Sequence, residues 1–322
     1  MHYYLYTISI IILIKLSSIY SFTTTYDPKE AEILGRVAAA VSGENYYECM
    51  KNDGILNENV EMLFSYNESN HKLRGDFLAG ILKLKNDPET LIVVHKSTSS
   101  SKQLISEGIY ALLPKGDFLN SGKVYLYPMK ALNVTYSIVS NEIKKLLNNS
   151  DYKNIIFTGH SLGGGLAVLD SYRCVYDGVC KNDTTKVVTF GSPRTGNCKF
   201  VSNFNNKVPY TYRVVVNDDL VPTIPSCETS FWGKECLACD KSWFDMYYHV
   251  GTEIYYDTNT NGNYTECQKY IEDPNCGSKV FGWFEVPKYL FNAQYYFDKH
   301  TKYFETVYNQ TFDETKCDFY IE

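Results

Sequence analysis

The sequence predicts an α/β fold in which helices flank a central, mostly parallel sheet. Short, continuous apolar runs indicate strands buried on both faces, as parallel strands usually are. A helical stretch separates two of these runs, in the order of a parallel strand–helix–strand unit. The 322 residues contain no linker rich in Pro, Gly or Ser, no repeat and no low-complexity run. We therefore expect one domain over residues 22–322.

The first predicted helix spans residues 28–41. Asp27 is a suitable N-cap, and Pro28 fits the first helical position. Glu30, three residues after the cap, completes a capping box, and Gly43 ends the helix.

Strands and helices then alternate along the chain. The predicted buried strands are residues 91–94, 154–157, 186–190 and 212–216. The predicted helices are residues 133–149, which carry an apolar stripe, and residues 162–174. Residues 247–256 are predicted to form a strand pair or one long strand. The segment beyond Ser226 is rich in cysteine, so we expect a disulfide-rich C-terminal part.

The N-terminus carries an apolar run at residues 4–14, followed by small residues at 17–21. The run is too short to span a bilayer and predicts a signal peptide over residues 1–21, hence secretion. Lys15 follows the run and the start carries little positive charge, so an N-terminal anchor or a buried segment is the alternative. No other stretch is long and apolar enough to cross a membrane.

Ten cysteines lie outside the predicted signal peptide, enough for five disulfides in an oxidising compartment. We expect Cys174 to pair with Cys180, because the two are close and flank the end of a predicted helix. Cys236-x-x-Cys239, with His249 nearby, offers a zinc site as the less favoured alternative. The ten are Cys49, Cys174, Cys180, Cys198, Cys227, Cys236, Cys239, Cys267, Cys276 and Cys317.

Glycosylation acceptors and net charge indicate what kind of protein this is and which partners it can have. Six Asn-x-Ser/Thr acceptors predict a glycoprotein. The net charge is −6 and the basic residues are scattered, so we expect no nucleic-acid partner. The acceptors are Asn67, Asn133, Asn148, Asn182, Asn263 and Asn309.

The segment Gly159-His-Ser161-Leu-Gly163 has the Gly-x-Ser-x-Gly pattern. A buried strand precedes it and a helix follows it, as a nucleophile elbow requires. The two glycines remove side chains that would collide with strand and helix. The helix N-terminus supplies amides and a positive dipole end for an oxyanion. Ser161 is therefore the predicted nucleophile.

A serine nucleophile needs a histidine base, and the base needs an acid. On a nucleophile elbow the chain order is Ser, acid, His, which leaves His249 and His300 as candidate bases. Asp218 and Asp219 follow the strand at 212–216, where active sites of parallel sheets gather. Either aspartate fits the acid on this reasoning.

The chain resembles the fungal-type (class 3) lipases of the α/β-hydrolase fold, a family that includes feruloyl esterases. Five blocks occur in the family's order and together cover about residues 90–305. They are Thr158-Gly-His-Ser-Leu-Gly-Gly164, Thr189-Phe-Gly-Ser-Pro-Arg-Thr-Gly-Asn197, Asn217-Asp-Asp-Leu-Val-Pro222, Tyr248-His-Val-Gly-Thr-Glu253 and His300-Thr-Lys-Tyr-Phe304.

The resemblance implies the roles of individual residues. The family's acid precedes an apolar-Val-Pro triplet, which selects Asp219, and its late His-x-x-Tyr-Phe segment selects His300. The oxyanion donors fall on the backbone N–H of Leu162 and on Thr98. The family's Phe-Arg-Gly before this Ser/Thr donor reads His-Lys-Ser at residues 95–97 here, a departure that bears on the oxyanion hole.

These residues predict acyl transfer from an ester to water, without metal or cofactor. The resemblance implies a lipid ester, most simply an acylglycerol, at a lipid–water interface. A phospholipid or feruloyl-type ester is the first alternative, and an inactive secreted binding protein that kept the fold is the second. Apolar residues at 104–113 fit a core helix better than a lid helix.

Overall fold

The computed structural model describes residues 22–43, 45–73, 75–97, 114–229, 236–241, 243–270, 272–273, 275–277, 292–304 and 306–307. Its centre is an eight-stranded sheet. In spatial order the strands are β1 (Val60–Asn70), β2 (Gly75–Leu84), β3 (Thr90–His95), β6 (Asn154–His160), β7 (Thr185–Phe190), β8 (Tyr210–Val216), β9 (Thr252–Tyr256) and β10 (Tyr264–Glu266). Neighbours from β3 to β9 are parallel, and the outer pairs are antiparallel. The predicted sheet is confirmed.

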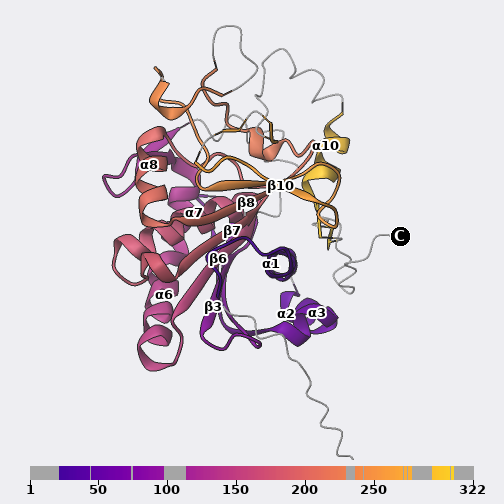
Figure 1. Cartoon of the computed structure of the whole chain (residues 1–322). Coiled ribbons are helices and arrows are strands. Elements are labelled where there is room, and N and C mark those ends of the chain that lie inside the picture. The colour runs from indigo at the N-terminus through magenta and orange to yellow at the C-terminus, as the bar shows by residue number, and fades with distance from the viewer. Residues whose placement is uncertain are drawn as a thin grey trace, which may run out of the picture.

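Helices cover both faces of the sheet, which gives three layers (Figure 1). One face carries α1 (Pro28–Ser42), with α2 (Tyr46–Asn52) and α3 (Gly54–Asn59) beside it. The other face carries α6 (Leu126–Asn149), α7 (Leu162–Tyr176) and α8 (Cys198–Lys207). The predicted helices correspond to α1, α6 and α7, although α6 begins earlier than expected.

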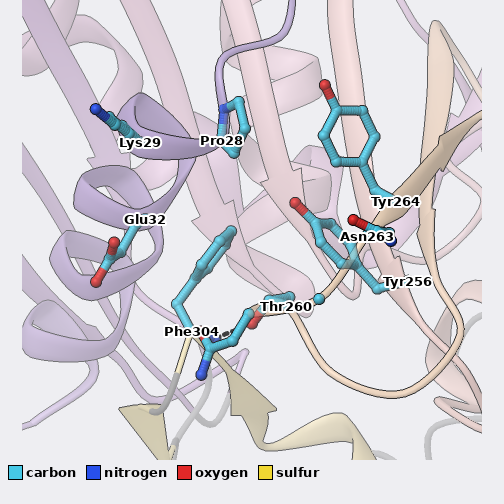
Figure 2. Close-up of a pocket in the computed structure, with 10 residues that line it drawn as sticks. Pro28, Lys29, Glu32, Tyr256, Thr260, Asn263, Tyr264 and Phe304 are labelled. Carbon is cyan, nitrogen blue, oxygen red and sulfur yellow. Dashed lines mark hydrogen bonds between the residues drawn. The ribbon is translucent and has the colours of Figure 1, made fainter.

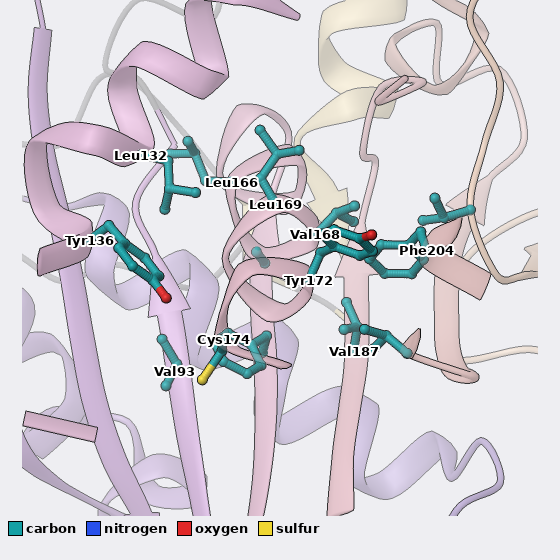
Figure 3. Close-up of a cluster of buried hydrophobic side chains, with 14 of the residues drawn as sticks. Val93, Leu132, Tyr136, Leu166, Val168, Leu169, Tyr172, Cys174, Val187 and Phe204 are labelled. Carbon is teal, nitrogen blue, oxygen red and sulfur yellow. The ribbon is translucent and has the colours of Figure 1, made fainter. Parts of the chain in front are cut away.

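The core lies in two clusters because successive residues of a strand point to opposite faces. In β7, Val188 and Phe190 pack in the α1 layer, whereas Val187 packs under α7. Figure 3 shows Val187 with Leu166 and Leu169 of α7. Each fully buried side chain of this kind contributes about 1.5–3 kcal/mol. Packing on both faces therefore holds the central strands, including β7, in fixed positions.

The prediction for residues 247–256 is wrong, because only β9 at the end of this range is a strand. Gly251 has φ +66°, and a Cβ there would lie 2.4 Å from the Thr211 carbonyl oxygen. The chain therefore turns at Gly251 before it joins β8. Tyr248 forms only an isolated bridge with Gly196.

The smaller elements lie in the connections between the main elements and in the C-terminal part, and η1 directly precedes β7. They are β4 (Lys115–Asp117), β5 (Lys123–Tyr125), η1 (Asn182–Thr184), η2 (Val221–Thr223), η3 (Cys239–Lys241), α10 (Ala293–His300), β11 (Lys302–Tyr303) and β12 (Thr306–Val307). None of the helices in the described ranges has both the length and the apolar character needed to cross a bilayer.

Within the described residues, one disulfide, Cys198–Cys239, ties the part beyond Ser226 to the rest of the molecule. The predicted pair Cys174–Cys180 is confirmed. The zinc alternative is wrong, because Cys236 and Cys239 belong to two different disulfides. The other disulfides within the described residues are Cys198–Cys239, Cys227–Cys236 and Cys267–Cys276.

Candidate active site

Ser161 occupies a sharp turn between β6 and α7. Its backbone has φ 55° and ψ −125°, a conformation that costs about 1–3 kcal/mol for a residue with a side chain. The turn is held because the Ser161 N–H donates to the Phe190 carbonyl oxygen at 2.9 Å. The hydroxyl is thus presented from a fixed backbone at the carboxyl end of β7.

Two glycines make this turn sterically possible. A Cβ at Gly159 would lie 2.4 Å from the Gly163 carbonyl carbon, and a Cβ at Gly163 would lie 2.3 Å from the His95 carbonyl oxygen. Both contacts are with backbone, which has little freedom to move away. Glycine is therefore required at positions 159 and 163 because other backbone segments approach both residues closely.

The loop after β8 separates the two candidate acids. Asp218 has φ +65°, and its side chain accepts a hydrogen bond from the Tyr295 hydroxyl at the surface. Asp219 is buried and accepts from His300 Nδ1 at 2.9 Å. It also accepts from the Tyr303 hydroxyl at 2.6 Å and the Val221 N–H at 2.9 Å. Asp219 is the acid that contacts a histidine.

His300 lies at the end of α10 and is 1% exposed. With Asp219 ionised, His300 Nδ1 carries the donated proton, which leaves Nε2 as the acceptor of the ring. Within the described residues, Nε2 has no hydrogen-bond partner. The carboxylate therefore holds one ring nitrogen of His300, and the other nitrogen is buried without a partner among the described residues.

His249, the other candidate base, has a different environment. Its Nε2 donates to the Pro222 carbonyl oxygen at 2.7 Å. Burial, with a further contribution from Arg213, lowers the pKa of His249 well below its usual range. The His249 side chain thus stabilises the loop that follows Asp219. It makes no hydrogen bond with Asp219 itself.

The three predicted catalytic residues converge beside the end of β7. Phe190 accepts the Ser161 N–H, as described above. A Cβ at the next residue, Gly191, would lie 2.7 Å from Asp219 Oδ2 and 3.0 Å from His300 Cε1. Asp219 and His300 therefore pack directly on Gly191. This glycine follows Phe190, whose carbonyl oxygen accepts the Ser161 N–H.

His160, the residue before the nucleophile, also contacts the base. The His160 and His300 rings have centroids 4.4 Å apart, and His160 Nε2 donates to the His300 carbonyl oxygen at 2.7 Å. Sequence reasoning missed this role, and it missed the Tyr303 hydroxyl on Asp219. Both residues stand inside the motifs used to predict the site, but nothing in those motifs shows what their side chains contact.

Of the two predicted oxyanion donors, Leu162 lies within the described residues and Thr98 does not. Leu162 is the first residue of α7, where backbone N–H groups lack helical partners and the helix dipole is positive. Thr98 and the apolar segment at 104–113 lie outside the described residues. Just before them, His95 Nε2 bonds to Asp170 Oδ2 at 2.8 Å, and both side chains are buried. This pair joins the end of β3 to α7.

A cavity of about 490 Å³ lies away from these residues, between α1 and the turn that joins β9 to β10. Figure 2 shows Phe304 and Tyr256 on its wall, with Glu32 of α1 opposite. Neither Ser161 nor His300 lines it. The candidate site is therefore defined by the convergence at β7 and not by this cavity.

The arrangement has the parts needed for nucleophilic acyl transfer. It offers a hydroxyl on a strained turn, an imidazole with one nitrogen held by a carboxylate, and a helix N-terminus behind the hydroxyl. One group of potential metal ligands occurs in the described ranges, Glu253 with Cys267 and Cys276. These two cysteines are joined in a disulfide, so they are not thiolate ligands.

Known protein sequences resemble this chain. Residues 92–229 match the family model described as lipase (class 3). Lipase ZK262.3 of Caenorhabditis elegans is 33% identical over 246 residues, 73% of this chain and 67% of that protein. Triacylglycerol lipase OBL1 of Ricinus communis is 29% identical over 144 residues, 42% of this chain and 24% of that protein. Phospholipase A1-II 1 of Oryza sativa subsp. indica is 34% identical over 102 residues, 31% of this chain and 26% of that protein.

Solved structures share the fold. Lipase II from Rhizopus niveus aligns with a TM-score of 0.67 at 19% identity, covering 87% of this chain and 95% of that chain. At this identity the likeness concerns the architecture of sheet and helices.

Proposed function

This chain belongs to the class 3 lipase family and is a carboxylic ester hydrolase, and we propose that it hydrolyses acylglycerols through Ser161, Asp219 and His300. One observation carries the proposal: Asp219 holds His300 Nδ1 at 2.9 Å while the His300 ring packs on the residue before Ser161. An imidazole so oriented has its basic nitrogen free for a serine proton.

The proposed reaction has two halves. His300 Nε2 takes the proton of Ser161 as the hydroxyl oxygen attacks the ester carbonyl carbon, and Asp219 stabilises the imidazolium. The tetrahedral intermediate collapses, and the leaving alcohol receives the proton from His300. Water then attacks the acyl-enzyme with His300 again as base, which releases the fatty acid and restores Ser161.

The oxyanion of each intermediate would lie at the N-terminus of α7. The Leu162 N–H is the first proposed donor, supported by its position directly after the nucleophile. Thr98 is the second proposed donor, on the family resemblance. One such donor typically contributes a factor of about 10²–10³ to kcat.

A phospholipid is the second candidate substrate, because the rice phospholipase A1 is 34% identical over its matched segment. The deciding experiment offers the purified protein emulsified trioleoylglycerol and, separately, phosphatidylcholine vesicles, and titrates the released fatty acid. We expect faster release from trioleoylglycerol. Faster release from phosphatidylcholine would instead favour the phospholipase reading.

Two variants control this experiment. Ser161→Ala should lower fatty-acid release by at least about 10³-fold, and Ser137→Ala, on the exposed surface of α6, should behave as wild type. Wild-type protein that releases no fatty acid from either lipid or from a soluble nitrophenyl ester would contradict the enzyme proposal. That result would favour the inactive binding protein.

We also propose that the protein is secreted after removal of residues 1–21 and that residues 22–322 form one glycosylated domain. The support is the disulfides and the exposure of the five glycosylation acceptors that fall in described ranges. Those acceptors are Asn67, Asn133, Asn148, Asn182 and Asn263. N-terminal sequencing of protein from culture medium, with glycosidase digestion, tests both parts.

A further inference from the structure

Two consecutive aromatic side chains stand out on the surface. Trp243 is 89% exposed and Phe244 is 71% exposed, more than any other large hydrophobic residue in the described ranges. Large exposed apolar groups are uncommon on soluble proteins unless they serve an interaction. The pair lies just after η3, in the disulfide-rich part of the chain.

The backbone that carries the pair is firmly held. The N–H groups of Trp243 and Phe244 both donate to Glu228 Oε2, each at 2.8 Å, and Glu228 is buried. The next residue, Asp245, accepts from Asn197 Nδ2 at 2.6 Å. The disulfide Cys198–Cys239 ties the preceding turn to α8. The rings are thus presented outward from a fixed backbone, which reduces the entropy lost on binding.

This segment is connected to the loop that carries the proposed acid. The Tyr247 ring packs on the Tyr125 ring, with centroids 4.5 Å apart. The Tyr125 hydroxyl donates to the Ile224 carbonyl oxygen at 3.4 Å. Ile224 lies in the same loop as Asp219. Tyr125 therefore connects Tyr247, three residues after Phe244, to the loop that carries Asp219.

Charges around the pair suit a lipid surface. Lys241 is exposed two residues before Trp243. Lys123 pairs with Asp245 at 3.3 Å, and both side chains are about half exposed. Tryptophan favours the boundary between headgroups and acyl chains, and lysine beside it can keep its ammonium group in the aqueous layer. The described charged residues beside the pair carry both signs, since Asp245 follows Phe244 and pairs with Lys123.

We propose that Trp243 and Phe244 form a docking point that inserts into the surface of a neutral or zwitterionic lipid aggregate. Insertion would bring the face that carries the catalytic loop toward the substrate phase. This inference rests on the proposed lipase function, because it assigns to the same enzyme the surface that meets aggregated substrate. It differs from a lid, since the pair lies on a backbone fixed by Glu228 and a disulfide.

The test compares the double variant Trp243→Ser/Phe244→Ser with Tyr47→Ser. Tyr47 is 56% exposed on α2, on the other side of the sheet from α8 (Figure 1). Binding is measured by flotation with dioleoylphosphatidylcholine vesicles that contain trioleoylglycerol. We expect the double variant to bind at least about tenfold more weakly, because burial of two aromatic side chains is lost. Tyr47→Ser should bind as wild type.

Hydrolysis separates docking from catalysis. The double variant should lose at least about tenfold in rate on emulsified trioctanoylglycerol at low lipid concentration, and keep its kcat/KM on soluble nitrophenyl acetate within about twofold. Inactivity of wild type on both substrates would contradict the proposed function, whereas the vesicle binding still tests the docking point.

Either of two kinds of result, in binding or in sedimentation, would overturn the docking proposal. One is equal vesicle affinity of the double variant and wild type, or an equal loss in Tyr47→Ser. The other is a wild-type dimer in sedimentation that the double variant lacks, which would make the pair a contact between two copies. Thermal unfolding of each variant confirms that it is folded.

Discussion

The ring of His160 lies against the ring of His300, and its Nε2 donates to the His300 carbonyl oxygen at 2.7 Å. The residue before the proposed nucleophile therefore fixes the backbone of the proposed base. Burial, together with the neighbouring His300, lowers the pKa of His160 well below its usual range. His160 is thus a neutral donor that positions residue 300.

Replacing His160 by Phe tests this positioning role. The substitution keeps an aromatic ring but removes the donor, so the His300 carbonyl loses its partner. We expect kcat on a soluble ester to fall about 10- to 100-fold with little change in KM, because a small displacement of the base affects the transition state most. His71→Phe, at an exposed site, is the control. An unchanged kcat in His160→Phe would contradict the proposal that His160 positions His300.

Tyr303→Phe tests the second support of the acid. The variant keeps the ring that packs against Phe190 but removes the hydroxyl that donates to Asp219 at 2.6 Å. Hydrogen bonds to charged groups contribute about 1.5–3 kcal/mol, so kcat should fall about tenfold or more at constant KM. Tyr256→Phe is the matched control, since it removes a buried hydroxyl bonded to Tyr26. Equal effects in both variants would indicate a general loss of stability.

Gly191 offers a steric test of the convergence. Gly191→Ala adds a Cβ that would lie 2.7 Å from Asp219 Oδ2, at a residue with φ +54°. Gly178→Ala places a Cβ at φ +71° with nothing within 4 Å, so it carries the backbone strain without the collision. We expect Gly178→Ala to lose about 1–2 kcal/mol of stability and no activity. Gly191→Ala should lose more than tenfold in kcat/KM, and similar activity of the two variants would contradict the proposed packing.

Two of the four histidines that are buried in the described residues, His160 and His249, predict how stability depends on pH. Burial lowers the pKa of both His160 and His249 in the folded state. Below the unfolded-state pKa of about 6.5, the unfolded chain therefore binds more protons than the folded one, and stability falls as pH falls. Each residue adds a slope that approaches about 1.4 kcal/mol per pH unit. Urea unfolding between pH 7.5 and 5 measures this slope. His249→Gln should reduce the slope by the contribution of one histidine, at most about 1.4 kcal/mol per pH unit. A slope that is flat in this range would be inconsistent with neutral buried imidazoles.

Much of the fold could be predicted because the central strands are continuous apolar runs. β3, β6, β7 and β8 are buried on both faces, so their composition alone indicates their environment. Residues 247–256 also look like a strand, but the turn at Gly251 depends on a contact with β8. That contact is long-range and leaves no local pattern.

The candidate site was predictable only in part for the same reason. The glycines around Ser161 indicate the turn directly. Asp218 and Asp219 are adjacent and chemically alike. Asp218 has a left-handed backbone, and its side chain reaches Tyr295 at the surface whereas that of Asp219 reaches His300 in the interior. The partners of His160 and Tyr303 are set by tertiary packing across more than eighty residues. No local pattern encodes such distances.

The most direct test of the proposed triad is covalent labelling with a fluorophosphonate probe, followed by mass spectrometry of the labelled peptide. We predict one adduct, on Ser161, and at least a hundredfold slower labelling in His300→Asn at neutral pH, because the serine then has no base. An adduct on another residue, or His300→Asn labelling at the wild-type rate, would contradict the assignment of Ser161, Asp219 and His300.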